Sequence, residues 1–174
     1  FILLTNKLYT KENTMILKLN NGEVEIELYS DVAPQHVERF KKLSNEGKYD
    51  GVVFHRVIEG FMAQTGDVKF GNSTNENFNI NLAGTGGSEL PNLKAEFSDT
   101  PHVRGTLSAA RAQDPDSANS QFFICFGAAP FLDRQYSAFG KVTKGMELID
   151  MIKKGDPQSG AVENPDKIIS IRSK

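Results

Sequence analysis

The stretch FHRVIEGFMAQTGD, residues Phe54 to Asp67, sets a cation and an amide among bulky apolar side chains. The polar members are Arg56 and Gln64, and the bulky apolar members are Phe54, Phe61 and Met62. A mostly apolar surface with a few polar groups is typical of a ligand pocket, in which the polar groups fix the orientation of the ligand. We therefore expect this stretch to form a wall of a binding pocket.

A second stretch, SQFFICF from Ser120 to Phe126, also sets an amide, Gln121, among bulky apolar residues such as Phe123. Neither stretch contains an evident nucleophile, general base or metal-binding cluster, so chemistry there would depend on binding and electrostatics. The pattern alone is equally consistent with core positions for the phenylalanines. It also leaves open that the glutamines are ordinary satisfied polar residues and that Arg56 is a surface or salt-bridged arginine.

Composition places the chain among ordinary globular proteins. Its 174 residues suit one domain with a hydrophobic core, and hydrophobic residues make up 39%. The net charge of −2 and the lack of a long apolar run predict neither nucleic acid nor membrane as a partner. A single cysteine, Cys125, excludes an internal disulfide and fits a reducing compartment, so a cytoplasmic location is expected. Three scattered histidines show no metal-ligand spacing, and we expect no metal and no cofactor.

The first residues lack regular periodicity. The apolar start, FILL, is too short for the core of a signal peptide, and Met15 opens the first patterned segment. We therefore expect residues 1–14 to be a leader or vector-derived segment and residues 15–174 to be the folded domain.

Local patterns predict a mainly β protein. Apolar and acidic residues alternate on both sides of Asn20-Asn21-Gly22, which predicts a β-hairpin over Met15 to Leu28 with Glu23, Glu25 and Glu27 on a solvated face. Helical spacing predicts helices over Asp31 to Gly47 and over Met146 to Lys153. Further strands are expected at Val52–Ile58, Arg104–Ala109, Gln121–Phe126, Ser137–Val142 and Ile168–Arg172. Many short strands and two helices favour a closed antiparallel barrel with helices that cap its ends.

Four motifs in order carry a resemblance to a known family. They are FHRVIEGFMAQTGD, GTGG at Gly84 to Gly87, LSAARAQDPDSANSQFFICF and FLDRQYSAFGKV. From about Met15 to the C-terminus the chain resembles a cyclophilin, a peptidyl-prolyl cis-trans isomerase, and it is most similar to bacterial members. The resemblance implies a closed eight-stranded antiparallel barrel capped by two α-helices.

The resemblance also implies roles for particular residues. Arg56 matches the catalytic arginine, and Gln64 matches a glutamine that holds the substrate backbone. The proline pocket falls on Phe61, Met62, Phe123 and Leu132. The rim, where backbone groups also bind the peptide, falls on Ala110, Arg111, Ala112 and Gln121. His55 matches a histidine beside the arginine, which we expect to be structural rather than an acid–base group.

Three positions depart from the common eukaryotic pattern. Phe131 stands where that pattern has a tryptophan, Tyr136 where it has a histidine, and Arg111 where it has an asparagine. The first change predicts weak binding of cyclosporin, because the indole N–H is lost. The other two concern the preference for substrate.

The resemblance implies an enzyme that accelerates rotation about X–Pro bonds and assists protein folding. Its partners would be proline-containing peptides and unfolded or partly folded proteins, and a monomer is expected. A module that binds proline segments without essential turnover, and a purely structural domain, are the alternatives. Among the remaining residues, Cys125 is expected to be a packed thiol, and His36 and His102 are expected to face solvent.

Overall fold

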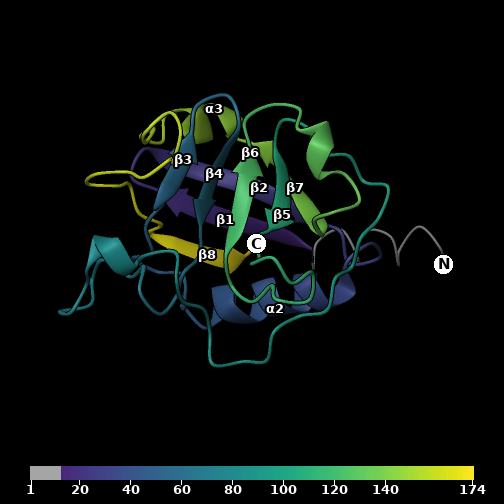
Figure 1. Cartoon of the computed structure of the whole chain (residues 1–174), viewed down its shortest axis with the longest axis horizontal. Coiled ribbons are helices and arrows are strands. Elements are labelled where there is room, and N and C mark those ends of the chain that lie inside the picture. The colour runs from purple at the N-terminus through teal and green to yellow at the C-terminus, as the bar shows by residue number, and fades with distance from the viewer. Residues whose placement is uncertain (1–12) are drawn as a thin grey trace.

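The computed structural model describes residues 13–174, which form one eight-stranded antiparallel sheet and two α-helices (Figure 1). The helices are α2 (Pro34–Asn45) and α3 (Met146–Asp150), which lie below and above the sheet in the view of Figure 1. Two short 3₁₀ helices, η1 (Ile80–Leu82) and η2 (Pro130–Leu132), lie in the connections. The strands are β1 (Thr14–Leu19), β2 (Gly22–Leu28), β3 (Arg56–Ile58), β4 (Met62–Thr65), β5 (Thr106–Ala109), β6 (Phe122–Cys125), β7 (Ala138–Lys144) and β8 (Ser170–Ser173).

The expected closed barrel is wrong. The strand order β3-β4-β6-β5-β7-β2-β1-β8 leaves β3 and β8 as edges, and these edges are 18 Å apart, so the sheet is an open half-barrel. The region of β3 is joined to the chain that precedes β8 by two isolated bridges, Val53 with Lys167 and Arg56 with Ala161, and by separate backbone hydrogen bonds, but not by paired strands. Single bridges do not make a continuous ladder of backbone hydrogen bonds, which closure of a barrel requires.

The expected hairpin and both expected helices are present. In the hairpin, Leu19 pairs with Gly22 across the two-residue loop. Helix α2 is shorter than expected and begins at Pro34, where a missing backbone N–H costs nothing. Gly47 follows it with a φ of 75°, the left-handed conformation that ends many helices. The expectation that residues 1–14 precede the domain falls mostly on residues outside the described part, and β1 begins at Thr14.

All five further strands form near the expected ranges, but β4 was not predicted. Met62, Ala63 and Thr65 are each at most 1% exposed, so this strand is buried on both faces. A strand of this kind does not show the alternation of apolar and polar residues that reveals a half-buried strand. Strand β6 is buried on both faces as well, but its four residues, Phe122 to Cys125, form a continuous apolar run, whereas β4 contains Gln64 and Thr65.

The main core lies between the sheet and the two helices, with Phe40 of α2 and Ile149 of α3 among its residues. Phe40 of the helix contacts the rings of Tyr49, Phe122 and Phe139, with centroids 5.1 to 5.7 Å apart. Tyr49 is buried and its hydroxyl donates to the Ser120 carbonyl at 2.7 Å, so the polar end of the ring is satisfied. The described residues contain no helix that is long and apolar enough to cross a membrane.

Two expectations about histidines are wrong, because His36 and His102 are buried. His36 lies in the first turn of α2, where the Glu96 carboxylate accepts its backbone N–H at 2.9 Å and lies 2.5 Å from its Nδ1. A carboxylate at a helix N-terminus satisfies N–H groups that have no partner within the helix. His102 has two side-chain partners, Asp133 and Ser108. Both histidines have partners distant in sequence, which local polarity does not reveal. The expected acidic face is only partly solvated, since Glu25 and Glu27 are half-buried.

Candidate functional site

Strands β3, β4 and β6 direct alternate side chains toward the main core and toward the opposite face of the sheet. Successive residues of a strand point to opposite faces of the sheet. One set belongs to the main core: Val57, Ala63, Phe122 and Ile124. The other set comprises Arg56, Ile58, Met62, Gln64, Phe123 and Cys125. The stretch SQFFICF is apolar at consecutive positions because β6 is buried on both faces.

A separate apolar cluster occupies this opposite face of the sheet. Met62, Phe123 and Leu132 are buried in it together with Cys125 and Ala129. The residues that pack against this cluster while partly exposed are Ile58, Phe61, Ala110 and Tyr136. Phe131, from η2, is 63% exposed, and its ring centroid lies 5.5 Å from that of Phe61. The structure therefore brings together the residues expected to hold a proline ring.

A chain of polar groups runs beside this cluster. Arg56 is the cross-strand partner of Gln64, and its Nη1 donates to Gln64 Oε1 at 3.3 Å. Gln64 Nε2 donates to Gln121 Oε1 at 3.1 Å. The Nε of Arg56 donates to the carbonyl of Ser159 at 3.1 Å. Within residues 13–174, no carboxylate pairs with Arg56 and its Nη2 has no hydrogen-bond partner, so the guanidinium retains a donor and its charge.

The far end of the polar chain is fixed by a loop. Gln121 Nε2 donates to the carbonyls of Gly84 and Gly86 at 3.0 and 2.8 Å. The buried carboxylate of Asp67 accepts the N–H groups of the same two glycines at 2.8 and 2.9 Å, and those of Lys69 and Phe70 at 3.0 and 2.9 Å. The glycine loop is thus held through both its N–H and its C=O groups. This arrangement orients Gln121, and through it Gln64 and Arg56.

His55 lies on the loop side of the site rather than in the polar chain. A Cβ added at Gly84, where φ is 98°, would approach the His55 ring to 2.8 Å, so both space and backbone conformation require glycine there. Burial lowers the pKa of His55, and the nearby charge of Asp67 opposes this effect. The Nδ1 of His55 is buried without a hydrogen-bond partner in the described structure. This environment favours a neutral ring.

The predicted rim residues form a braced turn. The N–H of Ala110 donates to the Gln121 carbonyl at 3.0 Å, and that of Ala112 donates to Ser117 Oγ at 2.9 Å. Arg111 stacks on the Tyr136 ring, with its Cζ 4.4 Å from the centroid. Its guanidinium donates to three carbonyls, those of Ala112, Gln113 and Gln135. Arg111 and Tyr136, two of the three positions that differ from the common eukaryotic pattern, therefore contact each other and stiffen one side of the site.

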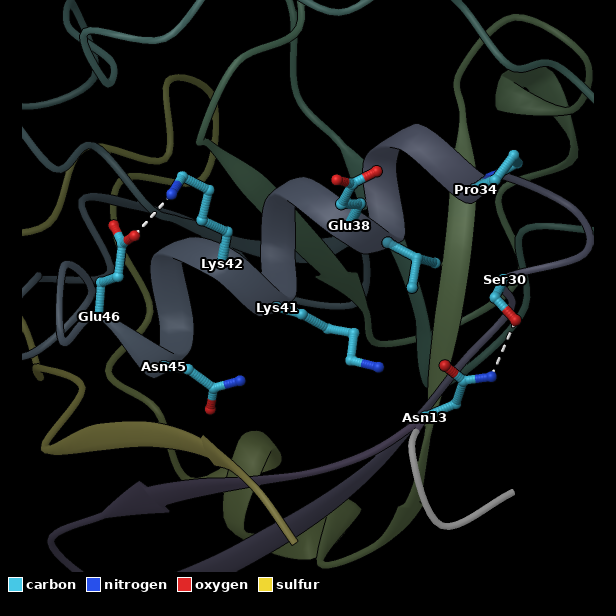
Figure 2. A pocket seen from close by; sticks show the side chains of 9 residues that line it. Asn13, Ser30, Pro34, Glu38, Lys41, Lys42, Asn45 and Glu46 are labelled. Atoms are coloured by element: carbon cyan, nitrogen blue, oxygen red, sulfur yellow. Dashed lines mark hydrogen bonds and ion pairs between the residues drawn. The ribbon is translucent and has the colours of Figure 1, made fainter. Parts of the chain in front are cut away.

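Two surface hollows can be compared with this arrangement. One, of about 1090 Å³, adjoins the polar chain and is lined in part by Gln64, Gln121, Ala110 and Gly84. The other, of about 630 Å³, lies along α2, where Lys42 pairs with Glu46 and Asn13 donates to Ser30 (Figure 2). The hollow along α2 includes none of the predicted site residues. The first hollow is therefore the one that is continuous with the candidate site.

Several members of the site were not identified from the sequence. Ser159 lies 103 residues from Arg56 and contributes only a carbonyl, so no local signal marks it. Asp67 ends the FHRVIEGFMAQTGD stretch, and the only available signal was an acid that follows Gly66 at the end of the motif. The glycines of GTGG were quoted for the resemblance, but their carbonyl contacts with Gln121 follow only from the fold.

Comparison with known proteins identifies the family. A family model described as cyclophilin type peptidyl-prolyl cis-trans isomerase/CLD matches residues 14–173. The chain belongs to the cyclophilin family. It is a peptidyl-prolyl cis-trans isomerase, as are its named relatives. A probable peptidyl-prolyl cis-trans isomerase of Brucella suis is 60% identical over 159 residues, which cover 91% of this chain and 81% of the relative. One from Helicobacter pylori (strain J99) is 40% identical, with 86% of each chain covered.

Solved cyclophilins have the same fold. A cyclophilin from Hirschia baltica superposes with a TM-score of 0.77 at 27% identity, covering 94% of this chain and 74% of that one. A cyclophilin type isomerase of Cryptosporidium parvum, solved in the presence of the dipeptide Ala-Pro, gives a TM-score of 0.78 at 27% identity, covering 92% and 98%. The Brucella suis relative, at 60% identity, agrees with the bacterial likeness, and all of these relatives agree with the cyclophilin motifs. In this cyclophilin, residues 13–174 contain no group of three acidic, histidine or cysteine side chains placed to hold a metal ion.

Proposed function

We propose that Arg56 is the catalytic residue with which this cyclophilin accelerates rotation about X–Pro bonds. The supporting observation is that Arg56 lies beside an apolar cluster with a free Nη2 and no carboxylate partner among the described residues. A guanidinium held by neutral acceptors keeps its full charge for a substrate. The mechanism then requires no proton transfer and no covalent intermediate.

The chemistry of the amide explains the use of a guanidinium. The C–N bond has partial double-bond character, and its rotation barrier is about 18–20 kcal/mol. As the bond twists, resonance is lost and a lone pair localises on the prolyl nitrogen. A hydrogen bond from Arg56 to that nitrogen is stronger in the transition state than in the ground state, which is the requirement for catalysis. Hydrogen bonds from charged groups contribute about 1.5–3 kcal/mol, and an apolar, water-poor site increases this value.

The other site residues have binding roles in this proposal. Phe61, Met62, Phe123 and Leu132 hold the proline ring while the chain on the other side rotates. Gln64, Gln121 and the rim at Ala110 to Ala112 bind the peptide backbone, with Phe131 and Tyr136 at the pocket edge and His55 as a structural neighbour. The relative solved with Ala-Pro supports proline-containing peptides as the ligand class for this chain.

We further propose that the substrates are unfolded or partly folded proteins in the cytoplasm and that the enzyme acts as a monomer. Burial raises the pKa of the single cysteine, Cys125, to about 12, so its thiol stays protonated and unreactive. A single protonated thiol forms no internal disulfide, which is compatible with the reducing cytoplasm. Its net charge of −2 gives no electrostatic reason to bind nucleic acid or an anionic membrane.

Retention of proline segments without turnover is the second candidate, since docking of the ring requires only the apolar cluster. A protease-coupled isomerisation assay on an Ala-Pro-Phe peptide, with Arg56→Ala measured in parallel, distinguishes the two. Catalysis that depends on Arg56 supports the enzyme proposal. Peptide binding that is equal in both proteins, with no acceleration by either, supports the binding module instead.

A further inference from the structure

Behind the proline pocket lies a buried histidine that the proposed mechanism does not use. His102 is 1% exposed, and its ring stacks on that of Phe123, with centroids 6.2 Å apart and an angle of 23° between the planes. Phe123 is in turn an expected wall of the pocket and contacts the Tyr136 ring edge-on at 5.9 Å. The Phe123 ring is therefore held by two neighbouring rings, with the imidazole of His102 stacked on it and Tyr136 against it edge-on.

Both nitrogens of His102 have partners, and these fix its tautomer. Asp133 Oδ1 accepts the backbone N–H of His102 at 2.8 Å and lies 3.0 Å from its Nδ1. An ionised carboxylate only accepts hydrogen bonds, so Nδ1 carries the proton. Nε2 then accepts from the hydroxyl of Ser108 at 2.8 Å. Burial lowers the pKa of His102 against the opposing effect of Asp133, which agrees with this neutral form.

These contacts join three separate elements of the site. Ser108 lies on β5 directly opposite Phe123 of β6. Asp133 caps the end of η2, immediately after Leu132, and the His102 carbonyl accepts the N–H of Ala129 at 2.9 Å just before η2. One side chain therefore connects β5, the neighbour of the strand that carries Phe123, with the turn that carries Leu132. A change in its hydrogen bonds is therefore expected to alter the spacing between Phe123 and Leu132.

Ser108, His102 and Asp133 have the connectivity of a catalytic triad, but they cannot act as one. Ser108 is fully buried at 0% exposure, so no substrate carbonyl reaches its hydroxyl. The arrangement is instead rigid support. We propose that His102, in its neutral Nδ1–H form, is a positioning residue that fixes Phe123 and Leu132 relative to Arg56. This inference rests on the proposed isomerase mechanism.

The test compares His102→Asn with wild type in the isomerisation assay. Asparagine keeps an N–H for Asp133 but loses the ring that supports Phe123 and the acceptor for Ser108. A displacement of the reacting group by about 1 Å costs on the order of 100-fold in rate, so we expect kcat/KM to fall about tenfold or more. The loss should lie mainly in kcat, because a shifted ring loses its alignment with Arg56 more than its apolar contact. The aromatic NMR signals of Phe123 should shift in parallel.

His36→Asn is the matched control, because it removes another buried histidine paired with a carboxylate, Glu96, at a site on α2. It should lose stability with kcat and KM unchanged. Near-wild-type kcat for folded His102→Asn, or unshifted Phe123 signals, would overturn the proposal. If His102→Asn does not fold, Ser108→Ala decides: a fall in kcat of severalfold supports the proposal, and wild-type kcat overturns it. Arg56→Ala, measured alongside, shows separately whether the proposed function holds.

Discussion

Gln64 lies opposite Arg56 across the β3–β4 pair and accepts a hydrogen bond from its Nη1 at 3.3 Å. Both acceptors of Arg56 are uncharged oxygens, the side-chain amide of Gln64 for Nη1 and the backbone carbonyl of Ser159 for Nε. They orient the guanidinium without neutralising its positive charge. A carboxylate in either place would compete with substrate for the charge. The strand register that makes these residues neighbours is therefore part of the proposed catalytic arrangement.

Replacement of Arg56 should abolish most activity while the fold persists. Loss of the charge-assisted hydrogen bond beside the apolar cluster predicts a fall in kcat/KM of about 100-fold or more for Arg56→Ala. Arg56→Lys should also be poor, because an ammonium group lacks the planar fork that serves Gln64 and substrate together. Activity is measured by the protease-coupled assay and folding by circular dichroism.

Arg104→Ala provides the control for that experiment, since Arg104 is an exposed arginine that pairs with Asp150 of α3. It should retain wild-type kcat/KM. Near-native activity of Arg56→Ala would exclude the proposed mechanism.

Asp67→Asn should destabilise the protein and lower its activity. In the wild type, Oδ1 accepts two backbone N–H groups and Oδ2 accepts those of Gly84 and Gly86. An amide presents N–H to one of these pairs, which leaves buried donors unpaired at a cost of about 1–3 kcal/mol. Urea unfolding measures this loss. Because the loop also holds Gln121, kcat/KM should fall severalfold.

Asp99→Asn is the comparison for Asp67→Asn, since Asp99 is an exposed carboxylate in an ion pair with Arg134. Exposed pairs contribute little, so its stability and activity should match wild type. Equal stability of the two variants would show that Asp67 does not hold the glycine loop.

The elements that follow from local signals were predictable. The Asn20-Asn21-Gly22 turn fixes the hairpin, and Pro34 and Gly47 bracket α2. Strand β4 and the open sheet were not, because burial on both faces hides the strand period and closure depends on pairing between distant segments. The same limit explains His36 and His102. Each lies in a locally polar segment of the sequence. Each is buried in the structure and pairs there with a carboxylate from another part of the chain.

The candidate site, like the fold, was predictable from the sequence only in part. The motifs were sufficient to nominate Arg56, Gln64 and Phe123 through the resemblance, and the structure brings these side chains to one face of the sheet. The residues that hold these side chains in place could not be predicted from the sequence. Asp67 accepts backbone N–H groups of the glycine loop, and His102 stacks on the ring of Phe123. Such support depends on three-dimensional placement rather than on residue type.

Stability should decrease as the pH falls below about 6.5, the ordinary histidine value. Burial lowers the folded-state pKa of both His55 and His102. The unfolded chain then binds protons at a higher pH than the folded protein does, so acid favours unfolding. Stability is fully present above the unfolded pKa and is lost as the pH falls toward the folded values. Urea unfolding at about pH 7.5 and about pH 5.5 measures the difference.

The variant His55→Gln should have a smaller loss of stability over that interval, since one depressed histidine is gone. A stability that stays constant or rises toward about pH 5.5 would contradict the direction of both shifts.

Activity, unlike stability, should be nearly flat from about pH 6 to 8.5. The proposed mechanism has no titrating acid or base, and arginine stays charged throughout. Histidines with lowered pKa values remain neutral over most of this range. A bell-shaped profile of kcat/KM would point to acid–base catalysis. If such a profile vanished in His55→Gln, His55 would be a catalytic residue.

Cyclosporin should inhibit this cyclophilin only at clearly higher concentrations than a relative with a tryptophan at the position of Phe131. Phe131 is 63% exposed at the edge of the pocket and packs on Phe61, so it offers an apolar contact but no hydrogen-bond donor. A buried acceptor left unpaired costs about 1–3 kcal/mol, which corresponds to roughly 5- to 150-fold in affinity. Phe131→Trp should recover part of that difference with little change in turnover, because Arg56 is untouched. Inhibition titrations of both proteins under the same conditions measure the effect. Low-nanomolar inhibition of the wild type, or an unchanged titration after the substitution, would show that this position does not control the affinity.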